Sequence, residues 1–412
     1  MRIVFLFYCI FFTAGIFAQN ALEVTIDSIM LDAIDSMAFP GAQVLIIKED
    51  SIVLHKPYGY HTYDNSRKVE LSHLYDLASV TKVTSGLPLL MKMYEVGKFD
   101  INKKLKDYFP KFKCSNKKDA TWQKILAHQA RLEPYLVFWK LAQDEDGNYK
   151  KNTFDTAYSK NYPIQITDQL YLHKNYYKKM VDQIKKSPLQ ATEKYKYSGL
   201  MFLLMPAIIS EILKTDFEPQ LKVNFLDRLG ADRMCYNPLK FYPLEEIVPT
   251  EIDTIFRNQL VHGTVHDEAA AMLGGVSCNA GLFSNAESLS KLFLMYMQMG
   301  KFEGGRCLKE ETMKLFSSYQ FADNRRGLGF DKPLLEYDAK AAYIAKSASP
   351  ESFGHSGFTG TFVWADPTHN LLFILLSNRV YPYRSQRKLY NMDIRPKLHQ
   401  AAYDILVGKE EE

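Results

Sequence analysis

Apolar residues recur along the chain in a helical pattern and in an extended pattern. A helix is predicted over 22–37, where apolar residues recur every three to four positions before the turn at Pro40-Gly41. Two runs rich in β-branched residues follow at 42–48 and 51–55, with a two-residue polar link between them. This arrangement predicts a β-hairpin.

The extended pattern returns near the C-terminus. Apolar runs at 361–365 and 371–377 flank a stretch of turn residues, and a helical pattern from about Asp393 closes the chain. We therefore expect both ends of the chain to contribute strands to one antiparallel sheet.

The middle of the chain is mainly helical in pattern. The clearest helical segments are 122–130, 200–213, 286–299 and 310–316. The predicted fold class is α+β, with an antiparallel sheet flanked by helices and an inserted helical lobe. The predicted division is an α/β lobe from 19–78 and 325–412, and a mainly helical lobe from 79–324.

The composition changes this picture little. The 412 residues carry a net charge of +4, which does not favour nucleic acid as a partner. The stretch 144–196 is rich in Lys and Tyr, which suits either a nucleic-acid groove or a solvated surface, and we expect the surface. Five cysteines without a C-x-x-C pair exclude a disulfide scaffold and a zinc ribbon.

The N-terminus has the features of a secretory signal peptide. Residues 1–18 carry one positive charge, an apolar run and small residues before Gln19, and cleavage is predicted after Ala18. A membrane anchor is the alternative, but the apolar run is shorter than the roughly 20 residues of a spanning helix. We predict a periplasmic or secreted protein without membrane insertion, whose four later cysteines (Cys114, Cys235, Cys278 and Cys307) meet an environment that permits disulfides.

Ser-x-x-Lys places a hydroxyl and an amine on one face of a helix, so that the amine can accept the hydroxyl proton. The pattern occurs at Ser79, Ser115, Ser288 and Ser385, and Lys82 completes the first copy. Ser79 follows an apolar stretch and opens a helical run, where free N–H groups favour a developing oxyanion. The alternative is that Ser79 only caps this helix. Ser115 and Ser385 lie in polar stretches, and Ser288 lies within an amphipathic helix.

Two further segments carry candidate chemistry. Tyr197-Ser-Gly199 precedes an apolar helix, and a Tyr beside cations can lose its proton below its usual pKa of about 10. The Gly-rich 353–361 leads into a strand whose N–H groups could bind an oxyanion. Either segment could instead be purely structural. Gly354-His-Ser356-Gly-Phe358 is not a nucleophile elbow, since Phe replaces the last Gly and a strand follows.

These three segments resemble the motifs of the serine β-lactamases and penicillin-binding proteins, closest to the class C group with its esterase and D-Ala-D-Ala carboxypeptidase relatives. Ser79-Val-Thr-Lys82 matches S-x-x-K, Tyr197-Ser-Gly199 stands at the Y-x-N position, and His355-Ser356-Gly357 stands at the K-T-G position. The surrounding segments 125–128 and 274–284 also resemble family sequence. The resemblance implies an active site between the two lobes.

The resemblance also implies a mechanism without a cofactor or a metal. Ser79 attacks an ester or amide carbonyl, Lys82 and Tyr197 move its proton, and the N–H groups of Ser79 and Phe358 bind the oxyanion. Desolvation beside Tyr197 would depress the pKa of Lys82. His355 and Ser356 would face the substrate carboxylate or the Tyr197 hydroxyl. The implied substrate is a β-lactam, a D-amino-acid amide or a peptidoglycan fragment.

One position departs from the family pattern. Gly199 replaces the Asn that holds the substrate amide, which predicts better turnover of activated esters than of β-lactams and a gain from Gly199→Asn. The same departure keeps open an alternative function, a penicillin-recognising sensor with little turnover. The cluster 262–268 offers metal-capable side chains, but Gly263 follows its first His where a zincin needs Glu. We expect a structural loop beside the active site there.

Overall fold

The computed structural model describes the backbone of residues 2–408 and the side chains of residues 19–408. The helices are α1 (Arg2–Asp35), α2 (Leu87–Glu95), α3 (Leu105–Tyr108), α4 (Trp122–Leu126), α5 (Tyr176–Lys186), α6 (Leu200–Leu213), α7 (Phe217–Leu221), α8 (Asp227–Leu229), α9 (Glu268–Ala271), α10 (Ala286–Met297), α11 (Glu310–Ser317), α12 (Lys388–Asn391) and α13 (Ile394–Leu406). The strands are β1 (Gly41–Lys48), β2 (Ser51–Gly59), β3 (Tyr75–Asp76), β4 (Phe154–Asp155), β5 (Ile164–Thr167), β6 (Leu170–Leu172), β7 (Met234–Tyr236), β8 (Glu251–Asp253), β9 (Gln259–Val261), β10 (Leu282–Ser284), β11 (Lys301–Phe302), β12 (Gly305–Arg306), β13 (Phe353–Ser356), β14 (Phe362–Asp366) and β15 (Leu371–Ser377).

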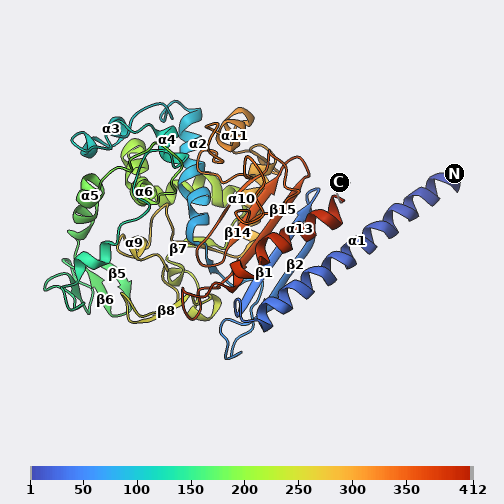
Figure 1. Cartoon of the computed structure of the whole chain (residues 1–412), viewed down its shortest axis with the longest axis horizontal. Helices are drawn as coiled ribbons and strands as arrows, with labels where there is room; N and C mark the ends of the chain where they lie inside the picture. Colours follow the sequence, from blue (N-terminus) through green and yellow to red (C-terminus); the bar gives the residue numbers. More distant parts are fainter. Residues whose placement is uncertain (1, 409–412) are drawn as a thin grey trace.

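The main sheet joins the two ends of the chain, as the apolar runs predict. Its strand order is β13-β14-β15-β1-β2, and every neighbouring pair is antiparallel. Figure 1 shows these blue and red strands side by side. The central pair aligns Ala42 with Ser377 and Lys48 with Leu371. The predicted α+β fold, with a sheet built from both ends, is confirmed.

Both faces of the sheet are buried, which explains why β15 is an uninterrupted apolar run. Phe373 and Leu375 pack with α1 and α13 on one face. Ile374 and Leu376 point the other way and join the core of the helical part. Figure 1 shows α13 lying along the sheet, with α10 beyond it. A strand covered on both faces has no polar alternation, because neither face meets water.

The helices of the middle region largely agree with the predictions. α6 has the predicted bounds, while α4 ends at Leu126, four residues earlier than expected. His128, two residues later, has a φ of 55°, outside the helical range. The helix predicted over 22–37 ends at Asp35.

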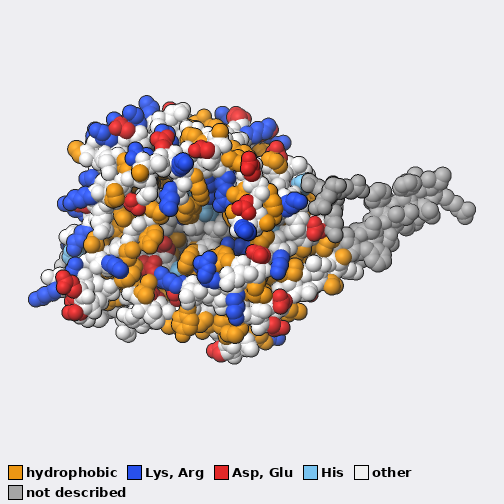
Figure 2. All heavy atoms as spheres, viewed as in Figure 1, with side chains coloured by type: hydrophobic (Ala, Val, Ile, Leu, Met, Phe, Trp, Pro, Cys, Tyr) orange, Lys and Arg blue, Asp and Glu red, His pale blue; other side chains and the backbone are white. Residues whose placement is uncertain are grey.

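The predicted signal peptide, residues 1–18, lies outside the described side chains. Among the described residues, none of the helices has both the length and the apolar character needed to cross a membrane. Positive and negative side chains are interspersed over the face in Figure 2, as the small net charge implies. Cys114, Cys235, Cys278 and Cys307 are all free thiols.

Candidate active site

Ser79 lies in a tight turn directly after β3. This 3-10 turn, Ala78–Val80, is called the Ser79 turn below. Its first residue, Ala78, has a φ of 45°, and the Ala78 N–H donates to the Asp76 carboxylate at 2.8 Å. Ser79 therefore does not cap a helix; it lies inside a turn whose backbone is held by a buried carboxylate.

The helical run predicted after Ser79 continues to Glu95, but it is not a regular α-helix throughout. A π-helical turn, Lys82–Gly86, follows the Ser79 turn, and α2 begins only at Leu87. Pro88 lies in the first turn of α2. Because Pro88 has no N–H to donate to the carbonyl of Thr84, a continuous α-helical ladder cannot pass through this segment. Proline is tolerated in the first turn of an α-helix, and the π-helical turn before α2 places Pro88 there.

The side chain of Lys82 is completely buried and points at Ser79. Its amine lies 3.0 Å from the Ser79 hydroxyl and 3.0 Å from the main-chain oxygen of Asn279. Burial lowers the pKa of Lys82 to about 7, with a further lowering from the Arg326 charge, whereas Asp267 raises it. The predicted depression of this pKa is confirmed. Near neutral pH a large fraction of the amine is neutral and able to accept a proton.

Tyr197 flanks the amine of Lys82 from the start of α6. The Lys82 amine lies 5.1 Å from the Tyr197 ring centroid. On the Tyr197 ring also packs His128, with the two ring centroids 4.4 Å apart. Burial raises the pKa of Tyr197 to about 12, although the Ser79 side chain opposes the shift. The expectation that cations would bring this pKa below its usual value is therefore wrong. The phenol stays protonated at neutral pH, so Lys82 is the better base of the two.

The third predicted segment lies on the edge strand of the main sheet. β13 ends at Ser356, and Gly357 follows in close contact with the Ser79 turn. A Cβ at Gly357 would lie 2.5 Å from the main-chain oxygen of Leu77 and 3.2 Å from the Ala78 Cβ. The Thr361 hydroxyl donates to the same Leu77 oxygen at 2.9 Å. The chain after Gly357, including Phe358, is thus held against the residues that carry Ser79.

His355 is buried beside Tyr197, with the two ring centroids 6.0 Å apart. Its Nδ1 lies 2.8 Å from the main-chain oxygen of Ser356. Burial, together with the charges of Arg326 and Lys82, holds the pKa of His355 well below its usual value. The imidazole is therefore neutral, and because its Nδ1–H donates to the Ser356 oxygen, its Nε2 can accept a hydrogen bond but cannot donate one to a substrate carboxylate. Ser356, next to it, is half-buried at the end of β13.

Gly199 caps the start of α6 from beside the Lys82 site. A Cβ at this position would lie 2.2 Å from Oδ1 of Asn279. The structure therefore places the carboxamide of Asn279 in the volume next to Gly199. The same Asn279 side chain donates through Nδ2 to Asp267 at 3.3 Å.

The other three Ser-x-x-Lys copies have structural surroundings. The Ser115 hydroxyl donates to the main-chain oxygen of Lys185 at 2.9 Å. Ser288, expected to face solvent or its own helix, is buried in α10, where its hydroxyl accepts from the Arg233 N–H at 3.0 Å. Ser385 is exposed outside the helices. Ser79 is the copy that contacts the lysine of its own motif.

The cluster 262–268 forms a loop that packs beside the site, as expected. The His266 N–H donates to Asp76 at 2.7 Å, and its ring contacts Glu251 at 2.7 Å. Arg384 contacts both Glu251 and Glu268. These polar contacts join the loop to β3, to β8 and to the segment of Arg384.

Sequence reasoning missed the roles of Asp267, Asn279, His128 and Arg326 around Lys82. Arg326 is almost fully buried, its guanidinium carbon lies 5.7 Å from the Tyr197 ring centroid, and it contacts Asp331 at 3.1 Å. The sequence draws attention to the segment of Asp267 through its metal-capable side chains and to the segment of Asn279 through its resemblance to family sequence. Nothing in the spacing of these residues indicates that they meet, because the tertiary fold brings them together.

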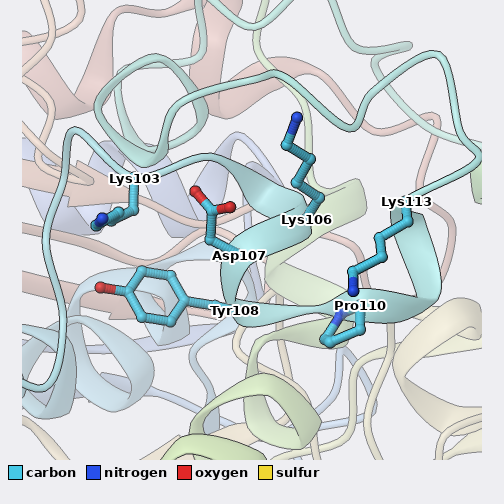
Figure 3. Close-up of a pocket in the computed structure, with 6 residues that line it drawn as sticks. All are labelled: Lys103, Lys106, Asp107, Tyr108, Pro110 and Lys113. Carbon is cyan, nitrogen blue, oxygen red and sulfur yellow. The ribbon is translucent and has the colours of Figure 1, made fainter.

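A surface pocket of about 650 Å³ lies near α3, and none of the predicted site residues lines it. Its lining includes Lys103, Lys106 and Lys113. Figure 3 shows the three amines pointing in different directions instead of converging on one point. Lys106 is already paired with Asp119 at 2.8 Å. This pocket is a basic surface feature separate from Ser79.

A serine whose hydroxyl contacts a buried lysine, below the edge strand of an antiparallel sheet, has the geometry of a lysine-assisted serine hydrolase. The chain matches the Beta-lactamase family over residues 26–394 and belongs to that family. The resemblance drawn from the three motifs is confirmed.

The chain is 27% identical over 394 residues to a protein of Salmonella enteritidis PT4 named "Putative D-alanyl-D-alanine carboxypeptidase", covering 90% of this chain and 86% of that protein. Among solved structures, it is similar to a class C β-lactamase, with a TM-score of 0.66, 13% identity and coverage of 95% and 97% of the two chains. It is also similar to the octameric penicillin-binding protein homologue of Pyrococcus abyssi, with a TM-score of 0.65, 17% identity and coverage of 93% and 77%. These structures establish the likeness of fold.

Proposed function

We propose that this chain is an exported serine hydrolase that cleaves an ester or amide bond of a peptidoglycan-derived peptide through an acyl-enzyme on Ser79. The contact of 3.0 Å between the Ser79 hydroxyl and the buried amine of Lys82 carries the proposal. The name of the Salmonella relative supports D-alanyl peptides as the substrate class. Export rests on the signal-peptide pattern of residues 1–18.

The first half-reaction follows from the protonation states in the site. The neutral amine of Lys82 accepts the Ser79 proton as Oγ attacks the carbonyl carbon, and a tetrahedral oxyanion forms. The N–H groups of Ser79 and Phe358 bind this oxyanion. The protonated Lys82, with the Tyr197 hydroxyl beside it, returns the proton to the leaving amine or alcohol as the scissile bond breaks. The product is an ester of Ser79.

Water then attacks the Ser79 ester, and the acid product leaves. Lys82 accepts a proton from the water and returns it to Oγ of Ser79. The Ser356 hydroxyl would orient the substrate carboxylate by a hydrogen bond, whereas the unprotonated Nε2 of His355 would accept one from the Tyr197 hydroxyl beside it. The site needs no metal or cofactor in this scheme.

The test uses purified protein with a fluorophosphonate and a fluorescent penicillin, followed by mapping of the adduct by mass spectrometry. Labelling of Ser79, lost in Ser79→Ala and retained in the matched Ser115→Ala variant, is the expected result. A label on Ser115, Ser288, Ser356 or Ser385 instead would overturn the assignment.

Turnover distinguishes the enzyme from a recognition protein that acylates without release. We expect release of D-alanine from an acyl-D-Ala-D-Ala peptide, and hydrolysis of a chromogenic ester, at many equivalents per enzyme. Stoichiometric labelling of Ser79 without turnover of any of these substrates would instead establish the sensor function.

A further inference from the structure

Gly199 is not required by its own backbone. Its φ is −87°, a value that any residue adopts, and its N–H donates to the main-chain oxygen of Pro134 at 3.2 Å. The constraint comes from Asn279, because a Cβ at Gly199 would lie 2.2 Å from Oδ1 and 2.9 Å from Cγ of that side chain. The carboxamide of Asn279 therefore fills the space that a side chain at position 199 would need.

Asn279 also contacts the Ser79–Lys82 pair through the amine of Lys82. Its main-chain oxygen accepts from the same Lys82 amine that contacts Ser79, each at 3.0 Å. Its Nδ2 donates to the carboxylate of Asp267 at 3.3 Å, and Asp267 raises the pKa of Lys82. The Lys82 amine thus links the main-chain oxygen of Asn279 to the Ser79 hydroxyl.

The loop around Asn279 is held in place by its neighbours. The Asn279 N–H donates to the hydroxyl of Ser277 at 3.1 Å, and that hydroxyl donates to the main-chain oxygen of Ala280 at 2.9 Å. The Asn279 side chain is nevertheless only half-buried, unlike the buried residues on both sides of it. A held loop with a partly exposed carboxamide can present that group to a bound molecule at low entropic cost.

We propose that Asn279 supplies the side-chain amide that position 199 lacks, and that its carboxamide binds the amide next to the scissile bond of an acylated peptide substrate. The inference rests on the proposed function of Ser79. It names the substrate class more closely, as molecules that carry a peptide amide beside the reacting carbonyl. A carboxamide both donates and accepts, which matches the N–H and C=O of such a group.

The proposal changes the expectation for Gly199→Asn. In that single variant the carboxamide of Asn279 would have to move from its place, because a Cβ at position 199 would lie 2.2 Å from its Oδ1. We therefore expect Gly199→Asn alone to lose peptide turnover, not to gain activity. Moving the amide, by combining Gly199→Asn with Asn279→Gly, removes the clash and restores a carboxamide at the site.

The experiment compares the full-length enzyme with Asn279→Ala, Asn279→Gly, Gly199→Asn and the double variant on two substrates. The first substrate is an acyl-D-Ala-D-Ala peptide, and the second is 4-nitrophenyl acetate, which carries no peptide amide. Asn279→Ala should lose roughly 10- to 100-fold in kcat/KM on the peptide and less than threefold on the ester, the size of one lost hydrogen bond to a reacting group. The double variant should recover at least tenfold on the peptide relative to Asn279→Gly.

Asn237→Ala is the matched control, because Asn237 supports the same loop through a bond to the main-chain oxygen of Gly274 at 3.0 Å. It should leave the ratio of peptide to ester turnover unchanged. Equal losses on both substrates in Asn279→Ala, or a double variant no better than Asn279→Gly, would overturn the role of Asn279. Fluorophosphonate labelling of Ser79 in every variant separates this failure from failure of the proposed function, in which even the wild-type Ser79 is not labelled.

Discussion

The amine of Lys82 lies 3.0 Å from the hydroxyl of Ser79, at a position where no part of the lysine side chain reaches solvent. Burial disfavours the charged amine and brings its pKa to about 7. The same burial raises the pKa of the neighbouring Tyr197 to about 12. One desolvated environment therefore prepares a neutral base and a protonated phenol side by side.

Acylation should depend on the deprotonated form of Lys82. We expect kcat/KM to rise about tenfold per pH unit below pH 7 and to level off above it, because the protonated amine cannot accept the Ser79 proton. Lys82→Ala should lose roughly 10²–10⁴-fold in kcat/KM, the usual contribution of a general base. Lys118→Ala, which alters the Ser115 copy of the motif, is the control. A wild-type profile in Lys82→Ala would refute the assignment.

Arg326 should set the pH of the acidic limb, the range below about pH 7 in which kcat/KM rises with pH. Its buried charge lowers the pKa of Lys82, so Arg326→Gln should move the limb to higher pH and reduce activity at pH 6.5 by roughly two- to tenfold. Arg325→Gln is a matched control, because Arg325 contacts the same Asp331 at 3.3 Å but is not among the main causes of the shifted Lys82 pKa. Kinetic pH profiles of the two variants give the comparison. Equal shifts in both variants would exclude a specific effect of Arg326.

The buried Lys82 should also cost stability at neutral and acidic pH. The unfolded lysine has the ordinary pKa of 10.5 and the folded one about 7, so the unfolded state binds more protons between these values. The loss of unfolding free energy caused by burying Lys82 is therefore complete below pH 7 and disappears above pH 10.5. Lys82→Met should therefore be more stable than wild type by roughly 1–4 kcal/mol at pH 6, with a smaller difference at pH 9. Urea unfolding at the two pH values measures this, and a difference that grows with pH would contradict it.

The main sheet could be predicted from the sequence because its strands are continuous apolar runs. Such runs at 42–48 and 371–377 have few alternatives in a globular protein, and the structure pairs them over their whole length. The Ser79 motif could be distinguished from its copies by the apolar residues around it. These signals are local, and local signals are what a sequence displays directly.

The surroundings of Lys82 depend on contacts that no spacing displays. The depression of its pKa was expected, but the opposite shift of Tyr197 was missed because complete burial outweighs nearby charges there. The sequence shows the missing side chain at Gly199 but not that the carboxamide of Asn279, 80 positions later, occupies the volume beside it. The π-helical turn that places Pro88 in the first turn of α2 is likewise not displayed by any spacing.

Gly357 lies so close to the Ser79 turn that a side chain there would displace its neighbours. A methyl group at Gly357 would lie 2.0 Å from the Thr361 hydroxyl and 2.5 Å from the Leu77 oxygen, and these two atoms are themselves hydrogen-bonded at 2.9 Å. The chain that carries Phe358 would have to move away from Ser79. Because a displaced N–H no longer meets the oxyanion, Gly357→Ala should lose about 10²–10³-fold in kcat while remaining folded.

The control for Gly357→Ala is Gly147→Ala. Gly147 has a φ of 83° and nothing within 4 Å of an added Cβ, so this substitution strains the backbone without touching the site. It should cost about 1 kcal/mol of stability and leave kcat unchanged. Steady-state kinetics and circular dichroism of both variants separate the two effects. If Gly357→Ala retains the wild-type kcat, the turn after β13 does not hold the Phe358 N–H at the reacting carbonyl, and the oxyanion must be bound elsewhere.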